Sequence, residues 1–124
     1  MLPGGVATAS IIISSYQHGR FIRQAIASAL AQTGPRVEVI VVDDGSTDDG
    51  PQRVARWNDP RIRMVSQANA GPGAARNRGI AEAVGEYVAF LDADDEWFPA
   101  YLQTVYGAMV AHPDCIATAA GRVV

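Results

Sequence analysis

The most informative stretch of the sequence is YVAFLDADDEWF at residues 87–98, in which an apolar segment runs directly into a cluster of acids. Residues 87–91 are aromatic, apolar or β-branched, which predicts a buried strand. The next five residues carry four carboxylates, and their mutual repulsion is costly unless a cation or hydrogen-bond donors neutralise it. Because strand ends line the ligand crevice of an open α/β sheet, the stretch predicts a metal-assisted phosphate or diphosphate site. A competing interpretation is that the acids cap the following helix or face solvent.

Length and composition fit one soluble globular domain. The chain has 124 residues, of which 48% are hydrophobic and 19% charged. A net charge of −3 gives no electrostatic reason to expect nucleic acid, and the single cysteine, Cys115, excludes an intrachain disulfide. No apolar run reaches the length of a spanning helix and residues 1–8 do not resemble a secretory signal, so we expect a cytoplasmic protein.

Short apolar runs alternate with helical patterns along the chain. Strands are expected at residues 9–14, 37–42, 62–66 and 87–91, with 115–119 as a candidate fifth strand. Helices are expected at residues 19–32, 48–57 and 74–84, and from Pro99 to near His112. This order predicts an α/β fold with a mainly parallel sheet, right-handed crossovers and helices on both faces.

Three other loops follow predicted strands and should open on the same edge as the acidic cluster; they span residues 14–19, 43–48 and 69–77. A carboxylate there can accept a hydrogen bond from a base N–H, and an aromatic ring can stack on that base. Glycines allow the backbone to approach a phosphate, and Arg76 can bind a pair of oxygens. Together the four loops predict a site for a nucleotide with a diphosphate.

Other interpretations of these motifs compete. In one of them, the sequence from Asp43 to Ser46 is a strand-to-helix turn and has no role in binding. Gly71, Gly73 and Arg76 half-match the dinucleotide fingerprint, but the third glycine is missing and the motif follows the third strand, which argues against a hydride-transfer cofactor. Phosphatases with an aspartate nucleophile and phospho-receiver domains are disfavoured as well, because all ten cations are arginine and no lysine is available.

The motifs resemble the N-terminal half of family 2 glycosyltransferases. The similarity is carried, in order, by residues 10–16, 27–33, 38–48, 69–79 and 85–95, and it covers nearly all of residues 9–103. It implies a Rossmann-like GT-A nucleotide-diphospho-sugar transferase fold. It also implies an inverting transfer of a sugar from a nucleotide-diphospho-sugar to an acceptor hydroxyl.

Asp92-Ala93-Asp94 resembles the DXD motif of that family. The resemblance implies that Asp94 coordinates a Mn²⁺ or Mg²⁺ ion on the donor diphosphate, with Asp92 close to the ribose or the metal. The metal would stabilise negative charge on the leaving group.

The donor-binding residues implied by the resemblance lie in the other three loops. Asp44 matches the position that binds the base, with Ser14 and Tyr16 beside it, and Asp43 is adjacent without a separate role. Arg76 resembles the arginine that faces the diphosphate or the base.

Full family members are longer than this sequence, and their acceptor-binding half supplies the general base. We therefore expect residues 1–124 to form a single donor-binding domain, with the general base outside this chain. A UDP-sugar is favoured over a GDP-sugar, and a glycan or lipid-linked molecule is the expected acceptor. The alternative is a nucleotide-sugar-binding fragment without transferase activity of its own. Self-association through surface left exposed, and a peripheral location at the inner face of the membrane, are further expectations.

Overall fold

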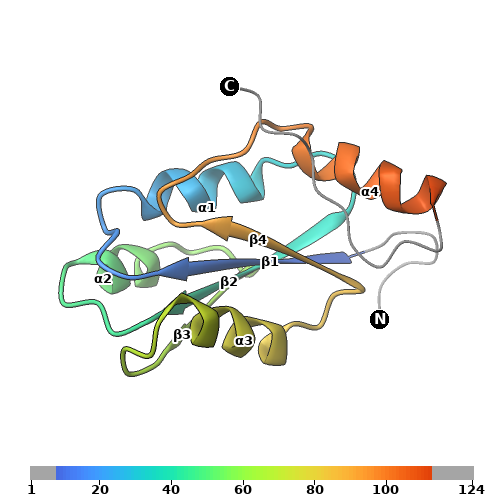
Figure 1. Ribbon diagram of the computed structural model, residues 1–124. Coiled ribbons are helices and arrows are strands. Elements are labelled where there is room, and N and C mark those ends of the chain that lie inside the picture. The colour runs from blue at the N-terminus through green and yellow to red at the C-terminus, as the bar shows by residue number, and fades with distance from the viewer. Residues whose placement is uncertain (1–7, 113–124) are drawn as a thin grey trace.

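The computed structural model describes residues 8–112, which form four strands and four helices (Figure 1). The strands are β1 (Thr8–Ser15), β2 (Arg36–Asp43), β3 (Ile62–Ser66) and β4 (Tyr87–Asp92). The helices are α1 (Ile22–Leu30), α2 (Gly50–Ala55), α3 (Pro72–Glu82) and α4 (Tyr101–Ala111).

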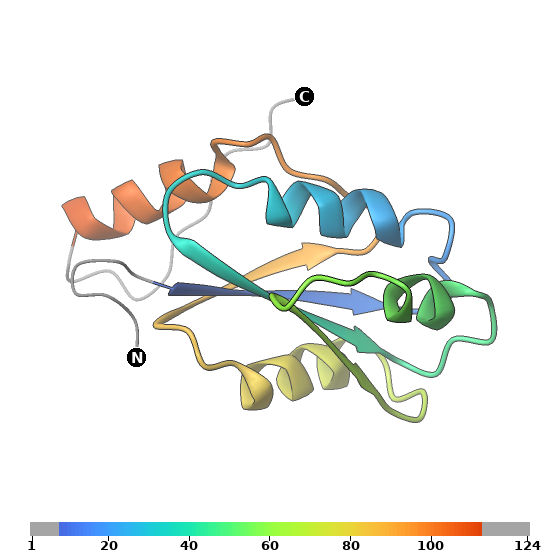
Figure 2. The same cartoon turned by 180° about the vertical axis from the view of Figure 1, so that it is seen from behind.

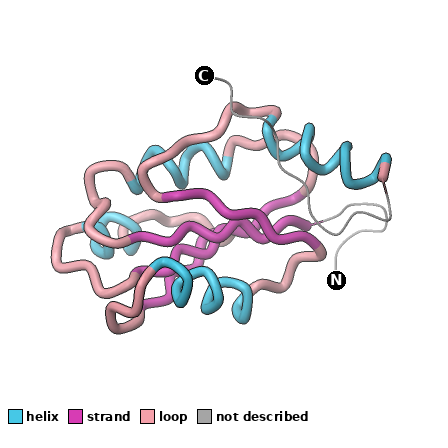
Figure 3. The backbone as a smooth tube through the Cα atoms, viewed as in Figure 1, coloured by secondary structure: helices cyan, strands magenta, loops and turns pink. Residues whose placement is uncertain are grey.

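The strands, magenta in Figure 3, form one parallel sheet. Their order in the sheet is β3-β2-β1-β4. From β1 the chain builds outward to β2 and β3 on one side and then returns to place β4 on the other side. The strand order therefore reverses between β1 and β4, and ligands of open α/β sheets bind outside the carboxyl ends of the strands at such a reversal.

Helices cover both faces of the sheet, as Figures 1 and 2 show from opposite sides. Successive side chains of a strand point to opposite faces, so Ile11 and Ile13 of β1 join the core beneath α1, α2 and α4. Ile12 faces the other way and packs with Ile40 of β2 beneath α3. The predicted parallel α/β architecture with helices on both faces is confirmed.

The helices differ from the sequence-based prediction mainly at their ends. α1 begins at Ile22 rather than near residue 19, because His18 O accepts hydrogen bonds from Phe21 N and Ile22 N in a turn before the helix. α3 begins two residues early at Pro72, where a proline suits the first helical turn. α4 begins at Tyr101, because Pro99 O instead accepts a hydrogen bond from Thr33 N.

The candidate strand at residues 115–119, with Cys115, lies outside the described residues. Within residues 8–112, none of the helices combines the length and the apolar character that crossing a bilayer requires.

Candidate functional site

A cavity of about 600 Å³ lies at the carboxyl ends of β1, β2 and β4, beside the start of α3. It collects residues from all four loops that the sequence analysis placed at this edge. The predicted site residues that line it are Ser14, Tyr16, Asp44, Arg76, Asp92 and Asp94. Ser14 of β1 is the direct partner of Asp92 of β4, so the cavity opens where the strand order reverses.

Asp44 is buried, and its carboxylate is saturated with hydrogen bonds. Oδ1 accepts from Gln67 Nε2 and Ala70 N, both at 2.9 Å. Oδ2 accepts from Gly71 N at 2.9 Å and Asn69 Nδ2 at 3.2 Å. The hydrogen bond from Gln67 is the main cause that lowers the pKa of Asp44, the two backbone N–H groups add to it, and burial acts against them. An ionised Asp44 therefore joins the end of β2 to the loop before α3.

Asp43 is placed differently, although it is the neighbouring carboxylate. Its side chain is buried and its Oδ2 accepts a hydrogen bond from Ser46 N at 3.0 Å, which closes the turn after β2. It is not among the residues lining the cavity. The same turn needs Gly45 at φ 84°, where a side chain would be strained and its Cβ would lie 2.8 Å from Asn69 N.

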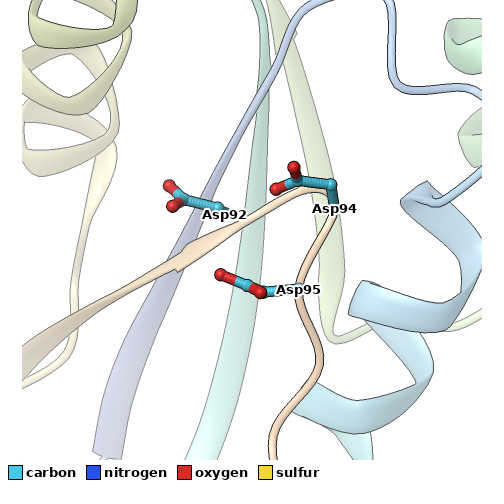
Figure 4. A group of neighbouring side chains, drawn as sticks. All are labelled: Asp92, Asp94 and Asp95. Carbon is cyan, nitrogen blue, oxygen red and sulfur yellow. The ribbon is translucent and has the colours of Figure 1, made fainter. Parts of the chain in front are cut away.

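Three exposed carboxylates gather at the end of β4 (Figure 4). Asp92, Asp94 and Asp95 can each offer one oxygen such that these oxygens lie within 4.8 Å of one another. A set of converging carboxylate oxygens fits a hard divalent cation such as Mn²⁺ or Mg²⁺. Asp95 was not assigned to the metal from the sequence; the turn that brings it back is closed by its N–H, which donates to Asp92 O at 3.0 Å.

Arg76 supplies positive charge to this acidic group. Its Nη2 lies 3.4 Å from Asp92 Oδ1, and both side chains are about half exposed. The start of α3 thus presents a guanidinium beside the carboxylates, where it can also reach a bound anion.

Some lining residues were not singled out from the sequence. His18 and Asn69 both line the cavity, and within residues 8–112 the buried Nδ1 of His18 has no hydrogen-bond partner. Their loops were predicted to open on this edge, but no spacing or periodicity distinguishes these two residues from their neighbours.

The sequence matches known proteins throughout this region. The model of glycosyl transferase family 2 matches residues 10–123. An uncharacterized glycosyltransferase of Nostoc sp. is 46% identical over 99 residues, which are 77% of this chain and 31% of that protein. The succinoglycan biosynthesis protein ExoO of Rhizobium meliloti is 47% identical over 91 residues, which are 73% of this chain and 26% of that protein. The chain thus spans less than a third of the length of these relatives.

Solved structures give the same result. TarS 1–349 of S. aureus, in complex with UDP-GlcNAc, matches with a TM-score of 0.77 and 32% identity, over 86% of this chain and 32% of that one. The mannosyltransferase PcManGT of Pyrobaculum calidifontis, in complex with GDP-Man and Mn²⁺, matches with a TM-score of 0.69 and 31% identity, over 76% of this chain and 29% of that one. These similarities identify the fold as that of GT-A glycosyltransferases, and the chain belongs to glycosyl transferase family 2.

Proposed function

We propose that this chain forms the donor site of an inverting glycosyltransferase and binds a nucleotide-diphospho-sugar together with Mn²⁺ or Mg²⁺. The observation that carries the proposal is the single cavity in which a buried carboxylate, an exposed aromatic ring, an arginine and an acidic cluster meet. The similar TarS and PcManGT structures contain UDP-GlcNAc and GDP-Man, which supports a sugar nucleotide as the ligand.

The base would bind between Tyr16 and Asp44, with Ser14 beside it. Tyr16 is 46% exposed, so its ring is free to stack on a base. All four acceptor positions of Asp44 are occupied, so a base N–H has to replace one of the present donors. Asn69 Nδ2 makes the longest of these contacts and is the donor we expect to give way. For Asp43, which the turn already uses, donor binding stays a prediction.

The diphosphate would lie between Arg76 and the acidic group. Asp94 and Asp92 are the proposed metal ligands, and Asp95 is near enough to contribute an oxygen. When bound, the metal supplies charge stabilisation for the departing nucleoside diphosphate. Arg76 can bind a diphosphate oxygen and orient the leaving group, and positioning of this kind supplies much of the rate enhancement.

We favour a UDP-sugar, as in TarS, over a GDP-sugar, as in PcManGT, and a glycan or lipid-linked hydroxyl as the acceptor. The general base and the acceptor site would lie outside this donor-binding domain. A cytoplasmic protein, peripheral at most to the inner face of the membrane, suits such a donor.

A second candidate is sugar-nucleotide binding without transfer by residues 1–124 alone. Self-association is a separate proposal: in the sheet formed by residues 8–112, β4 is an outer strand, and its Val88 and Phe90 are 40% and 46% exposed. Slow hydrolysis or transfer of a sugar nucleotide by this chain would decide against the binding-only candidate.

Calorimetric titration of UDP and GDP, with and without Mn²⁺, tests the proposed function. We expect micromolar binding that requires the metal and is lost in Asp94→Asn. Glu86→Gln is the matched control, because Glu86 is exposed at the opposite end of β4. Binding of neither nucleotide by the unmodified chain, or equal binding by Asp94→Asn, would contradict the proposal.

A further inference from the structure

Gln17 joins the loop after β1 to the loop after β2. Its backbone N donates to Ser46 Oγ at 3.0 Å. Its side-chain Oε1 accepts from Thr47 N at 2.7 Å and Asp48 N at 3.2 Å, and its Nε2 donates to Thr47 Oγ1 at 2.7 Å. One side chain therefore uses both lone pairs of its oxygen and one of its two amide hydrogens on the same facing loop.

The backbone of Gln17 is also unusual. It has φ 57°, and among residues 8–112 it is the single non-glycine residue with positive φ. Glutamine gains nothing from this left-handed conformation, which is uncommon for residues with a side chain. Strained residues of this kind persist when their surroundings fix them, and they gather at functional sites. The four hydrogen bonds to residues 46–48 are the contacts that fix this one.

These hydrogen bonds affect Tyr16, because the residues on both sides of it are held by the loop after β2. On one side, Ser15 is the last residue of β1, and its carbonyl accepts a hydrogen bond from Asp44 N at 2.9 Å. On the other side, Gln17 is hydrogen-bonded to residues 46–48 of the loop after β2. Hydrogen bonds therefore hold the backbone on both sides of Tyr16, whose side chain lines the cavity.

We propose that Gln17 is a positioning residue, which holds Tyr16 in place against the base of the donor. This inference rests on the proposed function, since it needs a nucleotide in the cavity. Gln17 does not line the cavity and acts through Tyr16. By holding the backbone beside Tyr16, Gln17 lowers the conformational entropy that the ring loses when the base binds. Groups that are already in place bind more tightly for that reason.

The test is a double-mutant cycle on Gln17→Ala and Tyr16→Ala, with UDP affinity measured by calorimetry in the presence of Mn²⁺. We expect each single variant to weaken UDP binding about fivefold to tenfold, and the double variant to be no weaker than Tyr16→Ala, because both changes remove the same interaction. Gln17→Asn, which tolerates positive φ but is one methylene shorter, should behave like Gln17→Ala. Gln24→Ala is the matched control, since Gln24 is an exposed glutamine on α1 that does not line the cavity and whose side chain makes no hydrogen bond within residues 8–112.

Two further readouts separate positioning from general damage. Binding of Mn²⁺-pyrophosphate, which carries no base, should be unchanged in Gln17→Ala. Exchange of the Thr47 and Asp48 amide hydrogens should become faster in that variant without any nucleotide. Losses that multiply in the double variant, or wild-type UDP affinity in Gln17→Ala, would overturn the positioning role alone. If the unmodified chain binds neither UDP nor GDP, the proposed function is wrong and the positioning role is overturned with it.

Discussion

Replacing Gly79 with alanine should destabilise the fold, because α3 lies against β1 with no room for a side chain. Gly79 is buried, and a Cβ there would overlap Ile12 Cγ2 and lie 3.0 Å and 3.1 Å from Ile12 Cγ1 and Cδ1. Ile12 is itself 1% exposed and packed with β2, so it cannot move aside. α3 would have to shift, and with it Arg76, which it carries to the cavity.

The net effect is a difference between two opposing terms. Overpacking a closed core costs about 1–3 kcal/mol, and a collision with a fully buried β-branched side chain belongs in the upper half of that range. Alanine in place of glycine in a helix returns about 1 kcal/mol. We therefore expect Gly79→Ala to lower the free energy of unfolding by about 1–2 kcal/mol, measured by urea denaturation followed by circular dichroism.

Two variants check that the collision is the cause. Gly107→Ala in α4 should stabilise the fold by roughly 0.5–1 kcal/mol, because among residues 8–112 no atom lies within 4 Å of its Cβ position. In an Ile12→Ala background, which removes all three clashing atoms, Gly79→Ala should no longer destabilise. A Gly79→Ala variant as stable as Gly107→Ala would refute the reasoning.

Three other changes have predictable outcomes. Arg76→Ala should raise Mn²⁺ affinity a few-fold without nucleotide, because the guanidinium beside Asp92 repels a cation, yet it should lower UDP affinity when Mn²⁺ is present. Electron paramagnetic resonance would measure the first affinity and calorimetry the second, and a fall in both affinities would contradict this prediction. The pKa of Asp44 lies below its ordinary value of 3.8, so the ionised carboxylate stabilises the fold above that pH, and this stability is lost as the pH falls through the lower pKa of the folded state. Asp44→Asn should therefore flatten this part of the pH profile of the urea midpoint, and an unchanged slope would argue against this role of Asp44. Gly45→Ala should cost more than about 1 kcal/mol, because it strains a positive φ and places a Cβ against the backbone N of Asn69. The turn would shift and carry the neighbouring Asp44 with it, so UDP binding should weaken as well; unchanged melting and UDP affinity would contradict this.

The strands and the edge that carries the site could be predicted from the sequence. The strands predicted at 9–14, 37–42, 62–66 and 87–91 lie within one residue of β1 to β4 at each end. Strands inside a parallel sheet are buried on both faces and read as largely apolar runs, as β1 and β2 do. β4 was expected to be buried as well, but it is the outer strand of the described sheet and exposes Val88 and Phe90. Once the strands are parallel, the loops that follow them must share one edge, and this is why their polar residues meet in one cavity.

The different roles of neighbouring residues could not be predicted from the local pattern. Asp43 and Asp44 are adjacent and chemically identical, and only the resemblance to family 2 separated them. Asp44 is distinguished by hydrogen bonds from residues 67–71, which come from another loop. The left-handed backbone conformation of Gln17 could not be predicted either, because it depends on contacts with residues 46–48 and not on the intrinsic preference of glutamine. Long-range contacts of this kind decide which polar residues build the site.

These contacts also make the two sides of the cavity unequal. On the side proposed for the base, Gln17 joins the first loop to the second, and Asp44 joins the second to the third, so three loops form one hydrogen-bonded unit. On the side proposed for the metal, among the described residues, the acidic side chains at 92–96 reach the other loops through one half-exposed ion pair, Arg76–Asp92. An exposed ion pair contributes little to stability. Substitutions among the acids can therefore alter cation binding while leaving the fold intact, whereas substitutions at Asp44 or Gln17 change the arrangement of the loops and the binding of the base together.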